Sequence, residues 1–300
     1  MYEDYYGFAE KPFRLMSDPK YLYLSESHTQ ALERLQKARE HGESFVLFTG
    51  GVGTGKTMLC RALLAQADHR TFASFLPNPL PSEEDLLTAV LQDLGLLPRT
   101  DERGIGPHVP LHALRATLRS FLLSLAPLGA CVVIVIDEAQ DLHPDILDQL
   151  RTLLLDQLRI LSVVESRMTM QVVLVGAPEL VPLLQSPLLR QLDACISTRI
   201  ELEPLSAEEV GRYIAHRLSI ANPAYTVAFT PKAVERIHAY TGGVPRLVNV
   251  LCDRALLGGY LAQSMRIDAE LLTAAAEGLD LESVEPKRQR WLHRLRRGWR

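Results

Sequence analysis

The stretch "GGVGTGKT" at residues 50–57 decides how this 300-residue chain folds. It fits the pattern G-x-x-x-x-G-K-[ST], follows an apolar run at 44–50 ("SFVLFTG") and opens a helical pattern at 56–67. Glycines let the backbone curl so that successive N–H groups point inward, and the helix that follows begins beside them. The pattern therefore predicts a strand, a phosphate-binding loop and a helix. The residues expected to contact phosphate are Gly50, Gly51, Val52, Gly53, Thr54, Gly55, Lys56, Thr57 and Met58.

Two side chains of this loop carry the charge chemistry that a nucleoside triphosphate needs. Lys56 supplies a positive charge for the β- and γ-phosphates, and Thr57 supplies a hydroxyl ligand for Mg²⁺. The expected cofactors are ATP and Mg²⁺.

A second apolar run, "CVVIVIDEAQ" at 131–140, ends in two carboxylates. Its β-branched residues predict a central strand, with Asp137 and Glu138 at its carboxyl edge. Asp137 lies 81 residues after Lys56 (137 − 56), a spacing that leaves room for an intervening strand and helices. We expect Asp137 to bind Mg²⁺ together with Thr57, and Glu138 to act as the general base that polarises the attacking water. The sequence therefore predicts ATP hydrolysis.

A third strand, "VVLVG" at 172–176, ends at Ala177, where ATPases with an additional helical domain usually carry a polar side chain that touches the attacking water. Either Gln140 or a neighbouring polar group substitutes for that side chain, or turnover is slow.

Arginines are expected to balance the charge of phosphoryl transfer. Arg246, in "GGVPRLVN", is placed to reach the γ-phosphate from the helical domain. Arg190 and Arg199 lie near the end of the α/β domain, where an arginine can enter the site of a neighbouring subunit; for both, a solvated salt bridge is an equal alternative.

Strands that alternate with helices predict an α/β domain to about residue 205, followed from Ser206 by helices only. The expected domains are an N-terminal block at 1–43, the P-loop ATPase domain at 44–205, a helical lid domain at 206–280 and a basic tail at 281–300. The four cysteines are widely spaced in apolar segments, which favours reduced core thiols over a metal site.

The last fourteen residues, "KRQRWLHRLRRGWR" at 287–300, hold seven Lys/Arg and no Asp/Glu. Subtracting them from the whole leaves 25 basic and 36 acidic residues in 1–286, a net charge of −11. Trp291, Leu292, Leu295 and Trp299 fall roughly on one helical face, which favours contact with an anionic membrane surface. A solvated tail, a flank of a membrane span and a nucleic-acid contact remain alternatives.

Several blocks together resemble the AAA+ ATPases of the general secretion pathway protein A type. These blocks are the N-terminal segment at 5–35, the P-loop, "DEAQDL" (137–142), "LVGAPEL" (174–180), "LLRQL" (188–192) and "TGGVPRLVNVLCDRAL" (241–256). The resemblance implies a five-stranded parallel sheet between helices, a C-terminal helical lid and ATP-driven self-association into homo-oligomers. Members typically join a cytoplasmic ATPase to a membrane span and a periplasmic module.

This resemblance implies an ATP-hydrolysing assembly factor at the cytoplasmic face of the inner membrane, acting on secretion, pilus or polysaccharide-export machinery. The expected partners are a nucleotide, further copies of the chain and envelope-assembly proteins. A DNA-associated, target-selecting ATPase of the transposition type is the alternative, although the acidic body argues against nucleic acid. The family usually has Gln where this chain has Ala177 and Arg where it has Cys195. Phe13 and Tyr23 are either adenine-stacking or core residues.

Overall fold

The computed structural model describes residues 2–16, 18–99, 109–161, 170–221 and 227–281, with the backbone alone at 154–161. These residues form two compact units. The α/β unit comprises His28–Val52 and Lys56–Leu202, and the helical unit comprises Met1–Ser27, Gly53–Gly55 and Glu203–Arg300. Within the described ranges, no helix combines the length and the apolar character that crossing a membrane requires.

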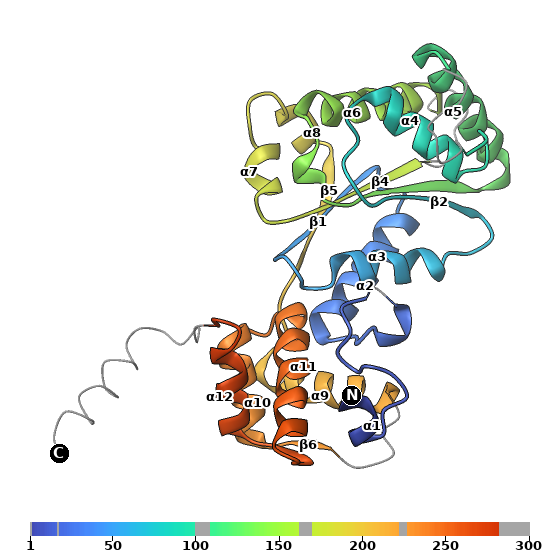
Figure 1. The fold of residues 1–300 in the computed structure, drawn as a ribbon. Helices are drawn as coiled ribbons and strands as arrows, with labels where there is room; N and C mark the ends of the chain where they lie inside the picture. The colour runs from blue at the N-terminus through green and yellow to red at the C-terminus, as the bar shows by residue number, and fades with distance from the viewer. Residues whose placement is uncertain (1, 17, 100–108, 162–169, 222–226, 282–300) are drawn as a thin grey trace. The chain divides into compact units, whose positions relative to one another are not determined.

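The α/β unit is built on a five-stranded, entirely parallel sheet with the strand order β2-β3-β4-β1-β5 (Figure 1). Because all strands run the same way, their carboxyl ends meet at one edge, where β1, β3 and β4 each deliver a loop. This confirms the predicted α/β class and the five-stranded sheet that the family resemblance implied. The strands are β1 (Phe45–Gly50), β2 (Thr71–Leu76), β3 (Cys131–Ile136), β4 (Met170–Gly176) and β5 (Ile196–Leu202).

Alternating side chains send each strand into two separate cores. Along β3, Val132 and Ile134 belong to one core, whereas Val133 and Val135 belong to the other. Both faces of the sheet are therefore covered, and its strands are apolar throughout. The first core is covered by α4 (Glu83–Asp93), α5 (Leu111–Leu125), α6 (Pro144–Leu161), α7 (Leu180–Leu184) and α8 (Arg190–Asp193), and the second by α2 (Glu26–Glu40) and α3 (Lys56–Ala65).

The helical unit packs the first residues of the chain against its C-terminal helices. Its aromatic core includes Tyr6 and Phe13, both fully buried. The unit also contains a short parallel ladder, β6 (Ala228–Phe229) with β7 (Arg266–Ile267), which the prediction of helices only after Ser206 misses. Two-residue strands carry too little periodic pattern to be recognised in a sequence. The helices are α1 (Tyr2–Tyr6), α9 (Ala207–Ile220), α10 (Pro231–Thr241), α11 (Pro245–Leu261) and α12 (Ala269–Glu277).

A buried arginine holds the N-terminal segment on α9. The Arg217 side chain is only 1% exposed, and its Nε and Nη2 donate to the backbone carbonyls of Pro12 (2.6 Å) and Arg14 (2.8 Å). Its guanidinium carbon lies 4.1 Å from the centre of the Tyr21 ring. Phe13 packs edge-on against Phe229, and Tyr23 against Tyr213, so both candidate stacking residues lie in the aromatic core of this unit.

Candidate nucleotide-binding site

The loop between β1 and α3 takes a conformation that its glycines make possible. Gly53 and Gly55 have φ angles of +82° and +110°, in the region that residues with a Cβ rarely adopt. At Gly53 a Cβ would also lie 2.7 Å from the Cβ of Arg246. Replacing Gly53 or Gly55 by another residue would therefore strain the backbone, and at Gly53 it would also create a clash.

Lys56, the first residue of α3, returns its side chain over this loop. Its Nζ donates to the carbonyl oxygens of Gly50 (2.9 Å) and Gly51 (3.1 Å), and the residue is 6% exposed. Burial lowers the pKa of Lys56, and the nearby Glu138 and Asp137 charges oppose that shift. No ion pair joins Lys56 to a carboxylate among the described residues, so its ammonium has only neutral oxygens as hydrogen-bond partners. A buried cation in this state, above a positive-φ glycine loop at the start of a helix, suits an anionic ligand such as a triphosphate.

Thr57 and Asp137 meet at the carboxyl edge of the sheet. The Thr57 Oγ1 donates to the Asp137 Oδ2 across 2.6 Å, although the two residues lie eighty positions apart in the chain. Burial raises the pKa of the Asp137 carboxyl, while hydrogen bonds from Thr57 and from the Glu138 amide lower it. A hydroxyl beside a carboxylate supplies the oxygen ligands that Mg²⁺ prefers, so this pair fits the expected metal.

Glu138 occupies a left-handed backbone conformation, with φ 51° and ψ 40°. It follows β3 directly and precedes a short 3-10 turn, η3 (Ala139–Asp141). This turn places the Gln140 side chain beside Glu138, and the Gln140 Nε2 donates to the Glu138 Oε2 at 2.9 Å.

Gln140 also reaches the neighbouring strand. Its Oε1 accepts a hydrogen bond from the Ala177 amide at 3.0 Å, immediately after β4. At Gly176 a Cβ would lie 2.5 Å from this oxygen, so the amide fills the space that a side chain would occupy there. The sequence patterns do not identify Gly176 as a residue of the site. The feature that could have indicated it is a glycine at the end of a buried strand, where a side chain is usually expected.

The three candidate arginines occupy different environments. Arg246 is exposed at the start of α11, and its backbone N–H donates to the Gly53 carbonyl, in the same compact unit, at 3.2 Å. Arg199 forms an ion pair with Asp193 (2.9 Å), whereas no ion pair involves the exposed Arg190 among the described residues. Cys195 lies in the same region, and its thiol donates to the Gln191 carbonyl.

The four cysteines are free thiols. Burial raises the pKa of the thiols of Cys60 and Cys252, which keeps them protonated. The basic segment at 287–300 lies outside the described residues.

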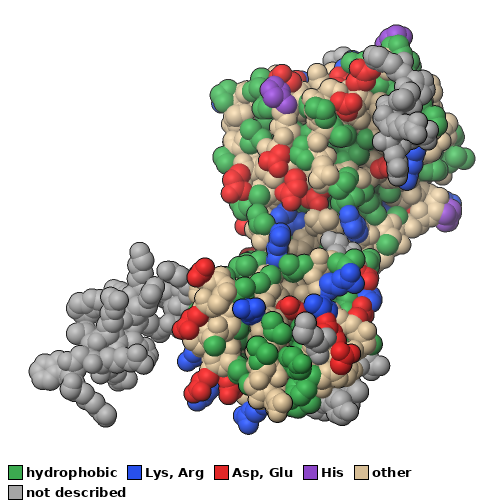
Figure 2. All heavy atoms as spheres, in the orientation of Figure 1, with side chains coloured by type: hydrophobic (Ala, Val, Ile, Leu, Met, Phe, Trp, Pro, Cys, Tyr) green, Lys and Arg blue, Asp and Glu red, His purple; other side chains and the backbone are tan. Residues whose placement is uncertain are grey.

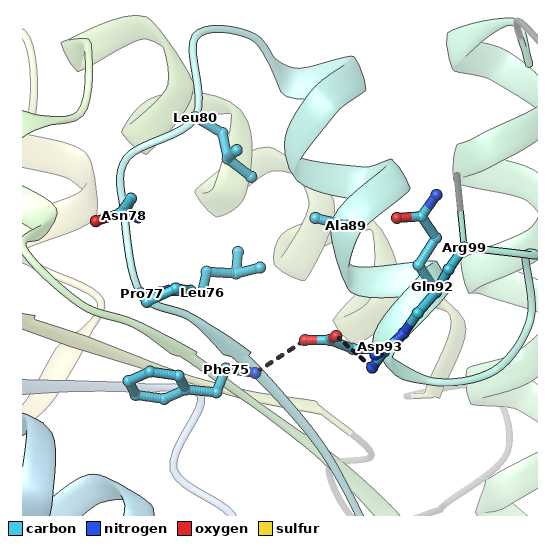
Figure 3. A pocket seen from close by; sticks show the side chains of 9 residues that line it. All are labelled: Phe75, Leu76, Pro77, Asn78, Leu80, Ala89, Gln92, Asp93 and Arg99. Atoms are coloured by element: carbon cyan, nitrogen blue, oxygen red, sulfur yellow. Dashed lines mark hydrogen bonds and ion pairs between the residues drawn. The ribbon is translucent and has the colours of Figure 1, made fainter. Parts of the chain in front are cut away.

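A separate cavity of about 350 Å³ opens where β2 ends beside α4 (Figure 3). Two of its polar side chains are bonded within the chain: the Asp93 Oδ2 accepts from the Ser74 hydroxyl and the Phe75 amide, and the Gln92 Nε2 donates to the Pro98 carbonyl. None of the residues that line this cavity belongs to the phosphate loop or to the acidic pair of β3.

Comparison with known proteins agrees with this geometry. The family described as AAA domain matches residues 38–184. General secretion pathway protein A of Aeromonas hydrophila is 41% identical over 267 residues, which are 89% of this chain and 46% of that protein. The chain thus spans about half the length of this curated relative.

Solved structures share the fold at low sequence identity. The Aeropyrum pernix ORC2 protein is 17% identical, with a TM-score of 0.62 over 90% of this chain and 72% of that one. The Thermotoga maritima RuvB branch migration motor is 21% identical, with a TM-score of 0.54 over 86% of this chain and 70% of that one. The glycine loop, the acidic strand end and the parallel sheet agree with these matches: residues 38–184 match the AAA domain family, and 89% of the chain is similar to general secretion pathway protein A.

Proposed function

We propose that this chain is a magnesium-dependent ATP hydrolase. The observation that carries the proposal is the 2.6 Å hydrogen bond from Thr57 to Asp137, which joins the phosphate loop to the acidic end of β3. Lys56 and the loop amides would bind the β- and γ-phosphates, and Thr57 with Asp137 would hold Mg²⁺, which neutralises phosphate charge when bound. A water oxygen would attack the γ-phosphorus as the bond to the β-phosphate oxygen breaks, and the Glu138 carboxylate would take the proton of that water.

Two substitutions test these roles. Lys56→Ala removes the buried cation, so we expect loss of ATP binding measured by calorimetry. Glu138→Gln keeps the side-chain shape but removes the base, so ATP should bind within about threefold of the parent while kcat falls by about 10²–10⁴-fold. The exposed pair on α2 offers matched controls, Lys37→Ala and Glu33→Gln, which should leave both measurements unchanged. Hydrolysis by Glu138→Gln at the parent rate would exclude Glu138 as the base.

Arginines are proposed to complete the site. Arg246 is the second residue of α11, and its backbone N–H donates to the Gly53 carbonyl of the phosphate loop, which supports a role in sensing the γ-phosphate. For a residue that acts in a neighbouring subunit, Arg190 is favoured over Arg199, because Arg199 is already paired with Asp193 within its own chain.

We further propose that ATP turnover drives the assembly of secretion machinery. Support comes from the curated relative, which is named general secretion pathway protein A and matches 89% of this chain. Homo-oligomers, envelope-assembly proteins as partners, and a place at the cytoplasmic face of the inner membrane are parts of this proposal.

Membrane contact through residues 287–300 has its own test. Co-sedimentation with vesicles containing anionic phospholipid should capture the full chain and should weaken as salt increases, because the proposed attraction is largely electrostatic. A chain that ends at residue 286 should stay in the supernatant; its capture to the same extent would exclude the tail as the contact.

The DNA-associated alternative is not favoured. Residues 1–286 carry a net charge of −11, and on the face shown in Figure 2 acidic side chains are interspersed with basic ones in each unit. A DNA-bound filament needs a basic surface that neutralises phosphates. Tight, ATP-dependent binding of duplex DNA by the chain that ends at residue 286 would reverse this preference.

A further inference from the structure

The carboxylate of Glu138 is held by a side chain from its own turn. Gln140 Nε2 donates to Glu138 Oε2 at 2.9 Å and more weakly to Asp141 Oδ2 at 3.3 Å. Because a side-chain amide is planar, the same group presents its oxygen in the opposite direction, towards β4.

The orientation of that amide follows from its fixed neighbour. The Ala177 backbone N–H can only donate, and it lies 3.0 Å from the Gln140 Oε1. Reversing the amide would place an NH₂ group against this N–H and an oxygen against the Glu138 carboxylate. Both contacts would then be repulsive, so Nε2 must face Glu138.

The two residues at the end of β4 have no polar side chain that could compete with Gln140 for these hydrogen bonds. Ala177 is 7% exposed and ends in a methyl group, and Gly176 has no side chain at the point where a Cβ would approach Gln140 Oε1 to 2.5 Å. Gly176 in turn pairs with Thr49, next to the first residue of the phosphate loop. A single carboxamide therefore links the ends of β3 and β4 beside that loop.

We infer that Gln140 is a positioning residue, which orients the Glu138 carboxylate and ties it to the end of β4 in place of the polar side chain that position 177 lacks. This inference rests on the proposed hydrolase activity. Gln140 restricts Glu138 to the rotamer in which Oε2 receives a proton donor. No described residue donates to the second carboxylate oxygen, which can therefore accept the proton of the attacking water.

The first test is Gln140→Ala in the full chain. Without the carboxamide, Glu138 samples other rotamers, so kcat should fall by about 10- to 100-fold while the affinity for a fluorescent ATP analogue stays within about twofold. Gln185→Ala, at the exposed glutamine that follows α7 as its C-cap, is the matched control and should keep the parent values. A kcat within twofold of the parent for Gln140→Ala overturns the inference.

A second variant separates the hydrogen bond to Glu138 from the packing of the turn. Gln140→Glu keeps the size and the acceptor for the Ala177 amide, but an ionised carboxylate cannot donate to Glu138. The kcat of Gln140→Glu should therefore fall by about 10- to 100-fold while its affinity for the ATP analogue stays within about twofold of the parent. A merely structural role predicts a kcat near that of the parent, because the size and the bond to β4 are kept, and that result overturns the inference.

The two proposals fail differently. If the parent hydrolyses ATP, Glu138→Gln does not, and Gln140→Ala matches the parent, then only the role of Gln140 is wrong. A parent chain that binds magnesium-ATP and never hydrolyses it overturns the hydrolase proposal and this inference together. Because Gln140→Glu conserves volume and the bond to β4, it provides the comparison even if Gln140→Ala does not fold.

Discussion

At the scale of single residues, burial disfavours the negative charge of Asp137 in the proposed metal site when no nucleotide or metal is bound. Asp137 is 2% exposed, and burial raises the pKa of its carboxyl above the ordinary value. Its ionised form at neutral pH is therefore less stable in the folded chain than in the unfolded one. Sites that bind cations commonly hold carboxylates in this state, because the ligand compensates for the lost hydration.

Asp137→Asn should stabilise the nucleotide-free chain. A raised pKa means that the folded state binds more protons than the unfolded state, so the destabilisation is present above the folded pKa and disappears below about 3.8, the ordinary Asp value. Asparagine can still pair with Thr57 and accept from the Glu138 amide, so we expect the thermal midpoint at pH 7 to rise by about 2–4 °C.

Calorimetry of both chains without nucleotide checks this, and Asp145→Asn, at an exposed carboxylate, is the control. The gain should vanish near pH 3, and the stabilisation that magnesium-ATP gives the parent should be lost. A lower midpoint for Asp137→Asn at pH 7 would contradict the argument.

At the scale of secondary-structure elements, one carboxylate caps the beginnings of two segments of the helical unit. Glu209 Oε2 accepts from the Ser206 amide in a capping box at the start of α9, and Oε1 accepts from the Glu26 amide at the start of α2. Burial raises the pKa of Glu209, but these amide hydrogen bonds outweigh it and leave the pKa lowered.

Glu209→Ala should therefore destabilise the chain by about 1–3 kcal/mol, since two amides at helix starts lose their acceptor. A lowered pKa places this stabilisation above the ordinary Glu value, and it is lost as pH falls through the folded pKa. Urea unfolding at pH 7 and at pH 3 measures both effects. Glu208→Ala, at the exposed neighbouring position, should change little; an equal loss for both variants would exclude the double cap.

The sequence allows the elements to be predicted better than their partnerships. The phosphate loop and the acidic strand end are local patterns, and local patterns can be recognised without knowledge of the fold. The central position of β3 follows from a run that is apolar on both faces, whereas the five-stranded parallel sheet is implied by the family resemblance. By contrast, the hydrogen bond between Gln140 and Ala177 requires the left-handed backbone conformation of Glu138 and the absence of a side chain at Gly176. Arg217 likewise bonds to backbone carbonyls about two hundred residues earlier in the chain. Such contacts depend on the tertiary arrangement, so no spacing in the chain reveals them.

At the scale of the whole molecule, the roles of the arginines depend on whether subunits share sites. If Arg190 acts in a neighbouring subunit, then a chain with Arg190→Ala keeps its own nucleotide site intact but cannot supply the arginine that its neighbour's site needs. A chain with Glu138→Gln has the opposite defect. An equal mixture of the two should therefore hydrolyse ATP faster than the mean of the separate preparations.

A steady-state ATPase assay over a range of mixing ratios checks this expectation. Arg199→Ala mixed with Glu138→Gln is the control and should show no such gain, because Arg199 is paired with Asp193. Activity of the first mixture equal to the mean of its components would exclude a shared site built on Arg190.

The anchoring of the N-terminal segment by Arg217 sets a practical limit on shortening this protein. A chain begun at residue 38, where the family match starts, would lose both carbonyl acceptors of the guanidinium and leave a cation unsolvated inside an aromatic core. Recombinant versions for crystallisation or enzymology should therefore retain residues 2–27, and a purification tag is better separated from Tyr2, which packs in that core and bonds to Asp253, by a spacer.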